Sequence, residues 1–452
     1  MKSTALEKDW TQGSVAGNLW SFSWPILISQ SLSMMGPTID MIWIGRLGAA
    51  SVAGVGISGM IVIVANSLTM GLFTGLRAMI ARSFGAGDRE SANHALQQSF
   101  VLGAVFSVMT ALIGLFLAEQ ILMVFGVAPD VVTEGAAYMR IQLVGMVTMS
   151  LLRITESSMQ ASGDTVTPMR ITVFYRILHI VLVPFLIFGW WIFPNLGVTG
   201  AALTNVITQS IGSILGLWFL FRGQSRLRPT LRNFQFDGKL IWRLAKVGIP
   251  ASITGMQRFF PSLVLVWFVS PFGTFAVAAY SLMQRIDNFL RNPAASLGRA
   301  TGILAAQNLG AGQPDRAEKG GWIANSTFTA VMVVIGIIIW FWAENVIGIF
   351  NTEPGLVEVA ASFLRIQIIG YLVFGPCVIL STCVEGVGDT LPSMIITLTT
   401  MWLVQIPLAF FLPKYTDIGV YGVQWAIVTA LLVRAVFFPI YFKMGRWKRR
   451  KI

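Results

Sequence analysis

Cysteine, histidine and charged side chains are all scarce in this chain of 452 residues. The two cysteines, Cys377 and Cys383, lie six positions apart on one predicted helix, which excludes a disulfide framework. The two histidines, His94 and His179, do not form a Cys/His zinc motif. Charged residues make up 12% of the sequence, about half the share found in soluble domains. We therefore expect neither a soluble domain nor a metal or other cofactor.

Apolar side chains, in contrast, make up 55% of the chain and gather in runs of about 20 residues, the length of a membrane-spanning helix. Because the runs are continuous and do not alternate with polar residues, they predict helices and not a β-barrel. We predict an all-α integral membrane protein with twelve transmembrane helices at residues 18–42, 52–76, 96–117, 138–161, 170–191, 198–221, 247–270, 275–297, 322–343, 361–384, 393–412 and 420–442.

One sequence unit occurs twice in the chain, 225 residues apart. AEQILMVFGVAP begins at Ala118 and AENVIGIFNTEP begins at Ala343, while QASGDTVTPM begins at Gln160 and EGVGDTLPSM begins at Glu385. Six predicted helices in each copy give both copies the same orientation, related by a pseudo-twofold axis along the membrane normal. Tandem membrane repeats build two lobes with a solute site between them, so the pattern favours a transporter.

The repeat divides the chain into four segments. We predict an N-terminal six-helix lobe at 1–221, a basic linker at 222–246, a second six-helix lobe at 247–442 and a basic tail at 443–452. Much of the positive charge behind the formal +12 lies in the linker, in the tail and beside the first Gly-Ala-Gly loop, all on the side of the N-terminus. The positive-inside rule then predicts both termini in the cytoplasm, with the chain in the plasma (cell inner) membrane. This placement argues against nucleic acid as a partner.

Several segments resemble the multidrug and toxic compound extrusion family, MATE. WPILISQSLSMMGPTIDMIWIGRLG, which contains Pro25 and Asp40, resembles the first-helix signature of that family. The segments ARSFGAGDRESANHA and AAQNLGAGQPDRAEKG resemble its loops after the second helix of each half, and the two GDT segments resemble its loops after the fourth. The resemblance covers nearly the full length. It implies a V-shaped exporter of twelve helices that exchanges Na⁺ or H⁺ for organic cations; we expect a monomer without enzymatic activity.

The fifth helix departs from the family pattern. In relatives coupled through the N-terminal lobe, the DinF-like type, this helix carries asparagines and an aspartate that join the first-helix aspartate. Here Arg176 and His179 stand at the asparagine positions and Val183 at the aspartate position, so half of that cation site is present. Other branches carry a carboxylate on the seventh helix, where this chain has Arg258 as its ionisable residue.

The repeat also helps to distinguish structural residues from functional ones, because a feature kept in both halves is expected to be structural. Glu119 and Arg140 recur as Glu344 and Arg365, which predicts one helix-end ion pair in each lobe. Five ionisable residues of the first half, in contrast, are replaced by neutral ones in the second. The replacements are Asp40 by Leu265, Arg153 by Val378, Glu156 by Ser381, Arg176 by Met401, and His179 by Val404.

Those five side chains predict a polar cluster that faces the lobe interior or a central cavity, because a charge at membrane depth costs about 2.5–3.5 kcal/mol. Arg153 and Glu156 share a face of the fourth helix, and Arg176 and His179 share a face of the fifth. We assign all five to cation coupling, with Asp40 as the proton-accepting carboxylate and His179 sharing the proton. The nearby Arg176 disfavours Na⁺, so H⁺ is preferred. Alternatively, the charges neutralise one another and tie helices together.

The second half has its own polar residues. Asp287 and Arg291 lie four positions apart on the eighth predicted helix, together with Arg285, and are expected to pair. Glu385 ends the tenth predicted helix next to a glycine turn. We name Arg258, Asp287 and Glu385 as candidate substrate-binding residues.

These observations favour a secondary active antiporter that exports amphipathic organic compounds by alternating access, with H⁺ preferred to Na⁺. A lipid-linked precursor flippase of the same superfamily is the alternative, supported by Arg176, Arg258, Arg285 and Arg291. A membrane-embedded enzyme would need a DxxxD-like cluster of acidic metal ligands, which the sequence lacks. A channel would conduct, whereas a transporter saturates and exchanges.

Overall fold

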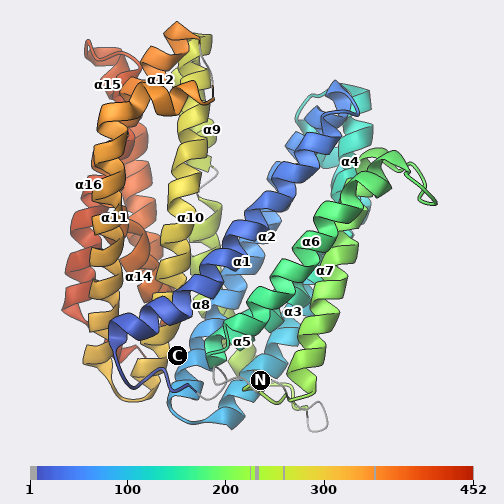
Figure 1. Cartoon of the computed structure of the whole chain (residues 1–452), viewed down its shortest axis with the longest axis vertical. Coiled ribbons are helices and arrows are strands. Elements are labelled where there is room, and N and C mark those ends of the chain that lie inside the picture. The colour runs from blue at the N-terminus through green and yellow to red at the C-terminus, as the bar shows by residue number, and fades with distance from the viewer. Residues whose placement is uncertain (1–7, 224, 230–233, 258–259, 351–352, 451–452) are drawn as a thin grey trace. The chain divides into compact units, whose positions relative to one another are not determined.

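The computed structural model describes residues 8–223, 225–229, 234–257, 260–350 and 353–450. Over these residues all regular secondary structure is helical and no strand is present (Figure 1). The first half of the chain contains α1 (Val15–Ile44), α2 (Ala49–Gly85), α3 (Arg89–Val124), α4 (Pro129–Val144), α5 (Met146–Ser162), α6 (Val166–Phe188) and α7 (Gly197–Phe221). The predicted helical class is therefore confirmed.

The second half begins with α8 (Gly238–Met256), α9 (Phe260–Val269), α10 (Thr274–Gly310), α11 (Pro314–Gly348) and α12 (Pro354–Leu372). It ends with α13 (Ser381–Gly386), α14 (Thr390–Thr400), α15 (Ile406–Tyr415) and α16 (Tyr421–Met444). Two π-helical segments, Gly375–Leu380 and Met401–Gln405, interrupt its long helices. Such segments widen a helix locally, because each backbone bond spans one more residue than in an α-helix.

The chain forms two compact units. The first contains Trp24–Ser252 with the segment that ends at Trp10, and the second contains Thr11–Ser23 with the chain from Ile253 onward. Both α1 and α8 are thus divided between units. The first part of α8, which begins within the segment predicted as a linker, packs on α2, where Ser252 Oγ donates to the backbone oxygen of Leu68 at 2.9 Å.

Eight helices are long and apolar enough to cross a membrane, or nine if α4 and α5, bent by 43°, form one broken span. This count covers the described residues only. The remaining predicted spans coincide with α1, with α8 and α9, and with α10. The last of these carries Arg285, Asp287, Arg291 and Arg299, which lower its hydropathy. The chain is therefore a multi-pass helical membrane protein, and twelve spans remain a prediction.

Glycine turns recur at matched positions of the two halves. Gly87 and Gly312, in the paired Gly-Ala-Gly loops, adopt φ values of +78° and +73°, and Gly163 and Gly388, in the paired GDT loops, adopt +103° and +92°. This left-handed region strains residues with a Cβ atom, which explains the glycines. The prediction that these motifs form tight turns is confirmed.

The native thiols are both shielded within the second unit. Cys377 and Cys383 are free and buried. The thiol of Cys377 donates to the backbone oxygen of Leu431 at 3.2 Å, which ties the π-helical segment to α16. Both cysteines therefore act as small packing residues here.

Candidate functional site

One buried carboxylate joins three helices of the first unit. Asp40 of α1 is 2% exposed, and its Oδ1 lies 2.8 Å from Nε2 of His179 on α6, which is 0% exposed. Its second oxygen, Oδ2, accepts a hydrogen bond from Nδ2 of Asn205 on α7 at 3.0 Å. Both oxygens of the carboxylate therefore have a nitrogen partner from a different helix. Figure 1 shows α6 and α7 running side by side.

Sequence reasoning missed Asn205, although a signal for it was present. The last helices of the two halves are related by an offset of 222 residues, because Leu196 of LGVTGAA corresponds to Ile418 of IGVYGVQ. With this offset Asn205 corresponds to Ile427. The same comparison that singled out Asp40 therefore also identifies Asn205.

An apolar cluster closes one side of this carboxylate. Each of the three helices places an apolar residue one turn from its polar one: Ile44 beside Asp40 on α1, Val183 beside His179 on α6, and Ala201 beside Asn205 on α7. These three apolar side chains are fully buried in one cluster. Close-packed apolar side chains leave little room for water, so the cluster shields Asp40 on this side.

Glu156 and Arg153 form a second polar contact in the same unit. Nη1 of Arg153 lies 3.2 Å from Oε2 of Glu156, and Thr172 Oγ1 of α6 donates to Oε1 at 3.1 Å. Thr172 and His179 lie on one face of α6, with Arg176 between them. No hydrogen bond or ion pair among the described residues joins Glu156 to Asp40. The five predicted coupling residues therefore form separate contacts along α6 and not one network.

Arg176, the fifth of these residues, has no acidic partner in the described part of the chain. Its side chain is 8% exposed, and its Nε is buried without a hydrogen-bond partner among the described residues. Its Cζ atom lies 5.1 Å from the centre of the Tyr175 ring. On its other side lies α1, where a Cβ atom built on Gly36 would fall 2.3 Å from Nη1. The guanidinium therefore packs directly on the α1 backbone, one turn before Asp40.

The second unit contains a different buried carboxylate. Asp287 of α10 is 6% exposed and accepts a hydrogen bond from the hydroxyl of Tyr371 on α12 at 2.8 Å. The predicted direct contact with Arg291 is not present, since no ion pair within 4.0 Å joins the two side chains, although the Arg291 charge acts on Asp287 electrostatically. The Arg291 guanidinium lies instead over Phe374, with Cζ 5.5 Å from the ring centre. A neutral hydroxyl from another helix supplies the hydrogen bond that the guanidinium was expected to make.

The other predicted substrate residues do not join Asp287. Glu385 of α13 is half-buried and accepts a hydrogen bond from Ser393 of α14 at 2.7 Å, which spans the GDT turn. Arg285 is exposed. Arg258 lies outside the described residues. Of the three candidates, Asp287 alone is a described and fully buried ionisable group.

The ion pairs predicted in both halves are present. Arg140 Nη2 lies 2.7 Å from Glu119 Oε1, and Arg365 Nη2 lies 3.1 Å from Glu344 Oε1. All four side chains are substantially exposed, so each pair contributes about 0–1 kcal/mol. Matched positions and matched partners identify these pairs as scaffold.

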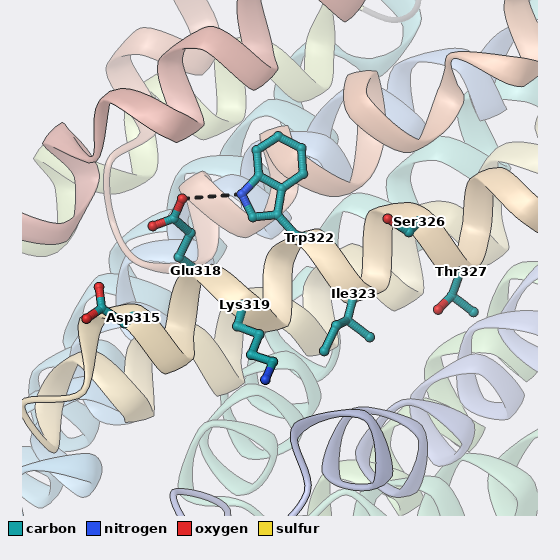
Figure 2. Close-up of a pocket in the computed structure, with 7 residues that line it drawn as sticks. All are labelled: Asp315, Glu318, Lys319, Trp322, Ile323, Ser326 and Thr327. Carbon is teal, nitrogen blue, oxygen red and sulfur yellow. Dashed lines mark hydrogen bonds between the residues drawn. The ribbon is translucent and has the colours of Figure 1, made fainter.

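A surface pocket of about 510 Å³ lies on the first turns of α11 in the second unit (Figure 2). Figure 2 shows the hydrogen bond of its main aromatic side chain, in which Trp322 Nε1 donates to Glu318 Oε1 at 3.3 Å. Nζ of Lys448 lies 2.5 Å from Oε2 of Glu318 and 3.3 Å from Oδ1 of Asp315, and these contacts raise the pKa of Lys448. The pocket contains none of the predicted site residues. Its lining is Asp315, Glu318, Lys319, Trp322, Ile323, Ser326 and Thr327.

Apolar helices of spanning length that enclose buried ionisable contacts are typical of membrane transporters. The family model MatE matches residues 25–185 and 250–411, one match in each half of the repeat. The chain therefore belongs to the MatE family, whose members are transporters and not enzymes. The two matches independently reproduce the 225-residue offset at their starts.

Relatives of known name cover nearly the whole chain. It is 29% identical over 447 residues to the probable multidrug resistance protein YoeA of Bacillus subtilis (strain 168), covering 97% of this chain and 96% of that one. It is 26% identical to the probable multidrug resistance protein NorM of Thermotoga maritima, with 95% and 92% covered. A solved MOP superfamily transporter from Pyrococcus furiosus superposes with a TM-score of 0.91 at 22% identity, covering 99% of both chains. At that identity the likeness shows the fold alone.

Proposed function

We propose that this chain is a secondary active antiporter that exports amphipathic organic compounds in exchange for H⁺. Its family and the names of its relatives support multidrug efflux. The observation that carries the coupling mechanism is the buried contact of Asp40 with His179 and Asn205. A carboxylate at this depth is costly to retain unless it has a function.

Proton uptake weakens the contacts that Asp40 makes. Its Oδ2 accepts from Asn205 and its Oδ1 lies against Nε2 of His179, and a proton on the carboxylate removes the negative charge that strengthens both contacts. A proton on His179 instead occupies Nδ1, which is buried without an acceptor among the described residues. A buried donor without a partner costs about 1–3 kcal/mol. Protonation therefore loosens the contacts that join α1, α6 and α7, which is the link that coupled transport needs.

The donor set around Asp40 favours H⁺ over Na⁺. Alkali cations bind to oxygen atoms, whereas both partners of this carboxylate are nitrogen atoms, one of them an N–H donor. Arg176 adds a fixed positive charge on the same face of α6 as His179. A Na⁺ ion at this carboxylate would lack further oxygen ligands among these partner atoms and would be repelled by Arg176, whereas a proton needs only one lone pair of a carboxylate oxygen.

We further propose the membrane arrangement that this mechanism requires. Twelve spans would place both termini in the cytoplasm of the plasma membrane, as the positive-inside rule predicts. Alternating access would open Asp40 in turn to each side of the membrane, with the chain working as a monomer. The apolar cluster around Ile44 and Val183 would close the external side in the state described here.

Purified protein in proteoliposomes tests the proposal. Efflux of an amphipathic fluorescent dye is measured under an imposed ΔpH or an imposed Na⁺ gradient. We expect the pH gradient alone to drive efflux, and Asp40→Asn to slow that efflux at least about tenfold. Glu119→Gln is the matched control, since it removes a carboxylate of the same unit that belongs to the scaffold ion pair with Arg140. Unchanged H⁺-driven efflux by Asp40→Asn would remove this residue from the mechanism.

A lipid-linked precursor flippase is the second candidate. The positive charge of Arg176 supports it, since Nε of this side chain has no acceptor among the described residues. Against it, Arg285 is exposed and Arg291 lies over an aromatic ring. Gradient-independent translocation of a fluorescent lipid-linked sugar phosphate, without dye efflux, would favour this candidate.

A further inference from the structure

We propose that Arg176 binds an anionic group on the transported molecule, so that the substrates of this chain are amphipathic compounds that carry a carboxylate or a comparable anionic group. The proposal names the substrate class of the transporter proposed above and rests on that function. It starts from one observation, a buried guanidinium that has no acidic partner among the described residues.

The described part of the chain does not neutralise this charge. Arginine stays protonated at any physiological pH, and a buried charge without a partner is strongly unfavourable. The Tyr175 ring lies 5.1 Å away and compensates the charge in part, while Nε faces no acceptor among the described residues. Two other arginines differ, because Arg153 pairs with Glu156 and Arg434 Nε donates to Thr400 Oγ1 at 2.6 Å. Arg176 has neither an ion pair of the first kind nor, at Nε, an acceptor of the second kind among the described residues.

The nearest carboxylates along α6 are already occupied. Asp40 uses one oxygen for His179 and the other for Asn205. Glu156 likewise uses one oxygen for Arg153 and the other for Thr172. Neither carboxylate forms an ion pair with Arg176, so an anionic group from outside the described chain can supply its counter-charge.

The backbone of α1 is shaped to admit the guanidinium. A Cβ atom at Gly36 would lie 2.3 Å from Nη1, a distance that no side chain tolerates without displacing the arginine. At the equivalent positions of the second half, Pro261 replaces Gly36 and Met401 replaces Arg176. The arginine and the glycine that leaves space for it therefore occur together, and only in the first half of the chain. A planar fork of N–H donors held in this way suits a carboxylate, which accepts two parallel hydrogen bonds.

A matched pair of dyes tests the proposal on the full-length purified protein. Rhodamine 110 carries a free carboxylate, and rhodamine 123 is its methyl ester with the same cationic ring system. Binding is measured by fluorescence anisotropy in detergent, without any gradient. We expect the wild type to bind rhodamine 110 about tenfold more tightly, because a charge-assisted pair forms with the acid alone. Equal affinity, or preference for the ester, would overturn the proposal.

Three variants locate the preference. Arg176→Gln is expected to reduce the ratio of affinities from about ten to about one. Arg140→Gln removes the same charge from a half-exposed arginine of the same unit and should leave the ratio at about ten. Gly36→Ala keeps every charge but displaces the guanidinium, so we expect the ratio to fall at least about threefold. An unchanged ratio in Gly36→Ala, or an equal loss in Arg140→Gln, contradicts the assignment.

Two features of the experiment distinguish a failure of the anion-site proposal from a failure of the antiporter proposal. The wild-type ratio and Gly36→Ala decide the matter even if Arg176→Gln does not fold, which thermal unfolding in detergent reveals. Because binding is measured without a gradient, a clear preference for the acid with no H⁺-driven efflux refutes the antiporter and supports the anion site. H⁺-driven efflux of both dyes, bound with equal affinity, would support the antiporter and refute the anion site.

Discussion

The two halves of the chain share a scaffold and differ in their buried charges. Both keep left-handed glycines at the same turns, and both keep a half-exposed ion pair at matched helix positions. The first half buries Asp40 against His179, whereas the second has Leu265 and Val404 at those positions. The second half instead buries Asp287. The features common to both halves therefore belong to the scaffold, and each half has its own buried ionisable group.

The largest effect is expected when the first half is given the residues of the second. His179→Val leaves the Asp40 carboxylate buried with one partner fewer, so we expect a loss of about 3 kcal/mol in stability. The double change Asp40→Leu/His179→Val removes charge and partner together and should recover part of that loss while abolishing H⁺-driven efflux.

A thermodynamic cycle of the wild type, Asp40→Leu, His179→Val and the double variant, followed by unfolding in detergent, measures this coupling. Additive effects of the two single changes would mean that the pair makes no net contribution. Asn205→Ile, which also copies the second half, is the companion change on α7.

A smaller effect is expected at the buried carboxylate of the second half. Tyr371→Phe removes the hydroxyl that donates to Asp287 and leaves that oxygen without its partner, which costs about 1–3 kcal/mol. Tyr280→Phe is the comparison on α10, because its hydroxyl accepts from Gln284 and interacts with Asp287 electrostatically without a hydrogen bond to it. Thermal unfolding compares the two variants, and a larger loss for Tyr280→Phe would contradict this account of Asp287.

The starts of α3 and α11 provide a pH-dependent comparison. Asp88 accepts a hydrogen bond from the Ser91 amide at 2.9 Å, and its hydrogen bonds with Ser91 lower the Asp88 pKa, whereas Gln313 at the equivalent position makes no side-chain cap. Asp88→Ala is expected to cost about 1 kcal/mol at pH 7. Because the folded pKa is lowered, this contribution is full above the unfolded value of about 3.9 and disappears as the pH falls through the folded value.

Unfolding of the wild type and Asp88→Ala at pH 7 and at low pH checks this sign. Gln313→Asp should add a comparable cap to α11 and gain up to about 1 kcal/mol. A wild-type advantage that grows on acidification would contradict the assigned direction.

The smallest effects are expected at the ion pairs that both halves keep. Glu119→Gln and Glu344→Gln each remove one half-exposed pair, so we expect losses below about 1 kcal/mol that are similar in the two halves and shrink in high salt. Salt-dependent unfolding measures both. A loss of several kcal/mol in one half alone would show that its pair is not scaffold.

The sequence predicts the fold well because its signals are local and repeated. Apolar runs mark the helices, and one offset aligns the glycine turns and the ion pairs. This kind of prediction reaches its limit at α8, whose helix starts at Gly238 inside the expected linker, because the apolar run that marks a span begins later than the helix does. The π-helical segments, such as Gly375–Leu380, also have no clear signal, since they arise from how helices pack.

The site is predicted less completely than the fold. Spacing placed His179 and Asp40 among the candidates, but the partner of a side chain depends on which helix lies opposite. Asp287 therefore meets Tyr371, 84 positions away, and not Arg291 on its own helix. Asn205 is not predicted by a comparison of charged residues between the halves, because its side chain is neutral.

The shielded native thiols have a practical consequence for studying motion. Because Cys377 and Cys383 are buried, maleimide and nitroxide reagents should spare them, so probes can be attached to engineered cysteines in the otherwise native sequence. One such label in each half would allow pulsed electron paramagnetic resonance to follow their separation while the pH is changed.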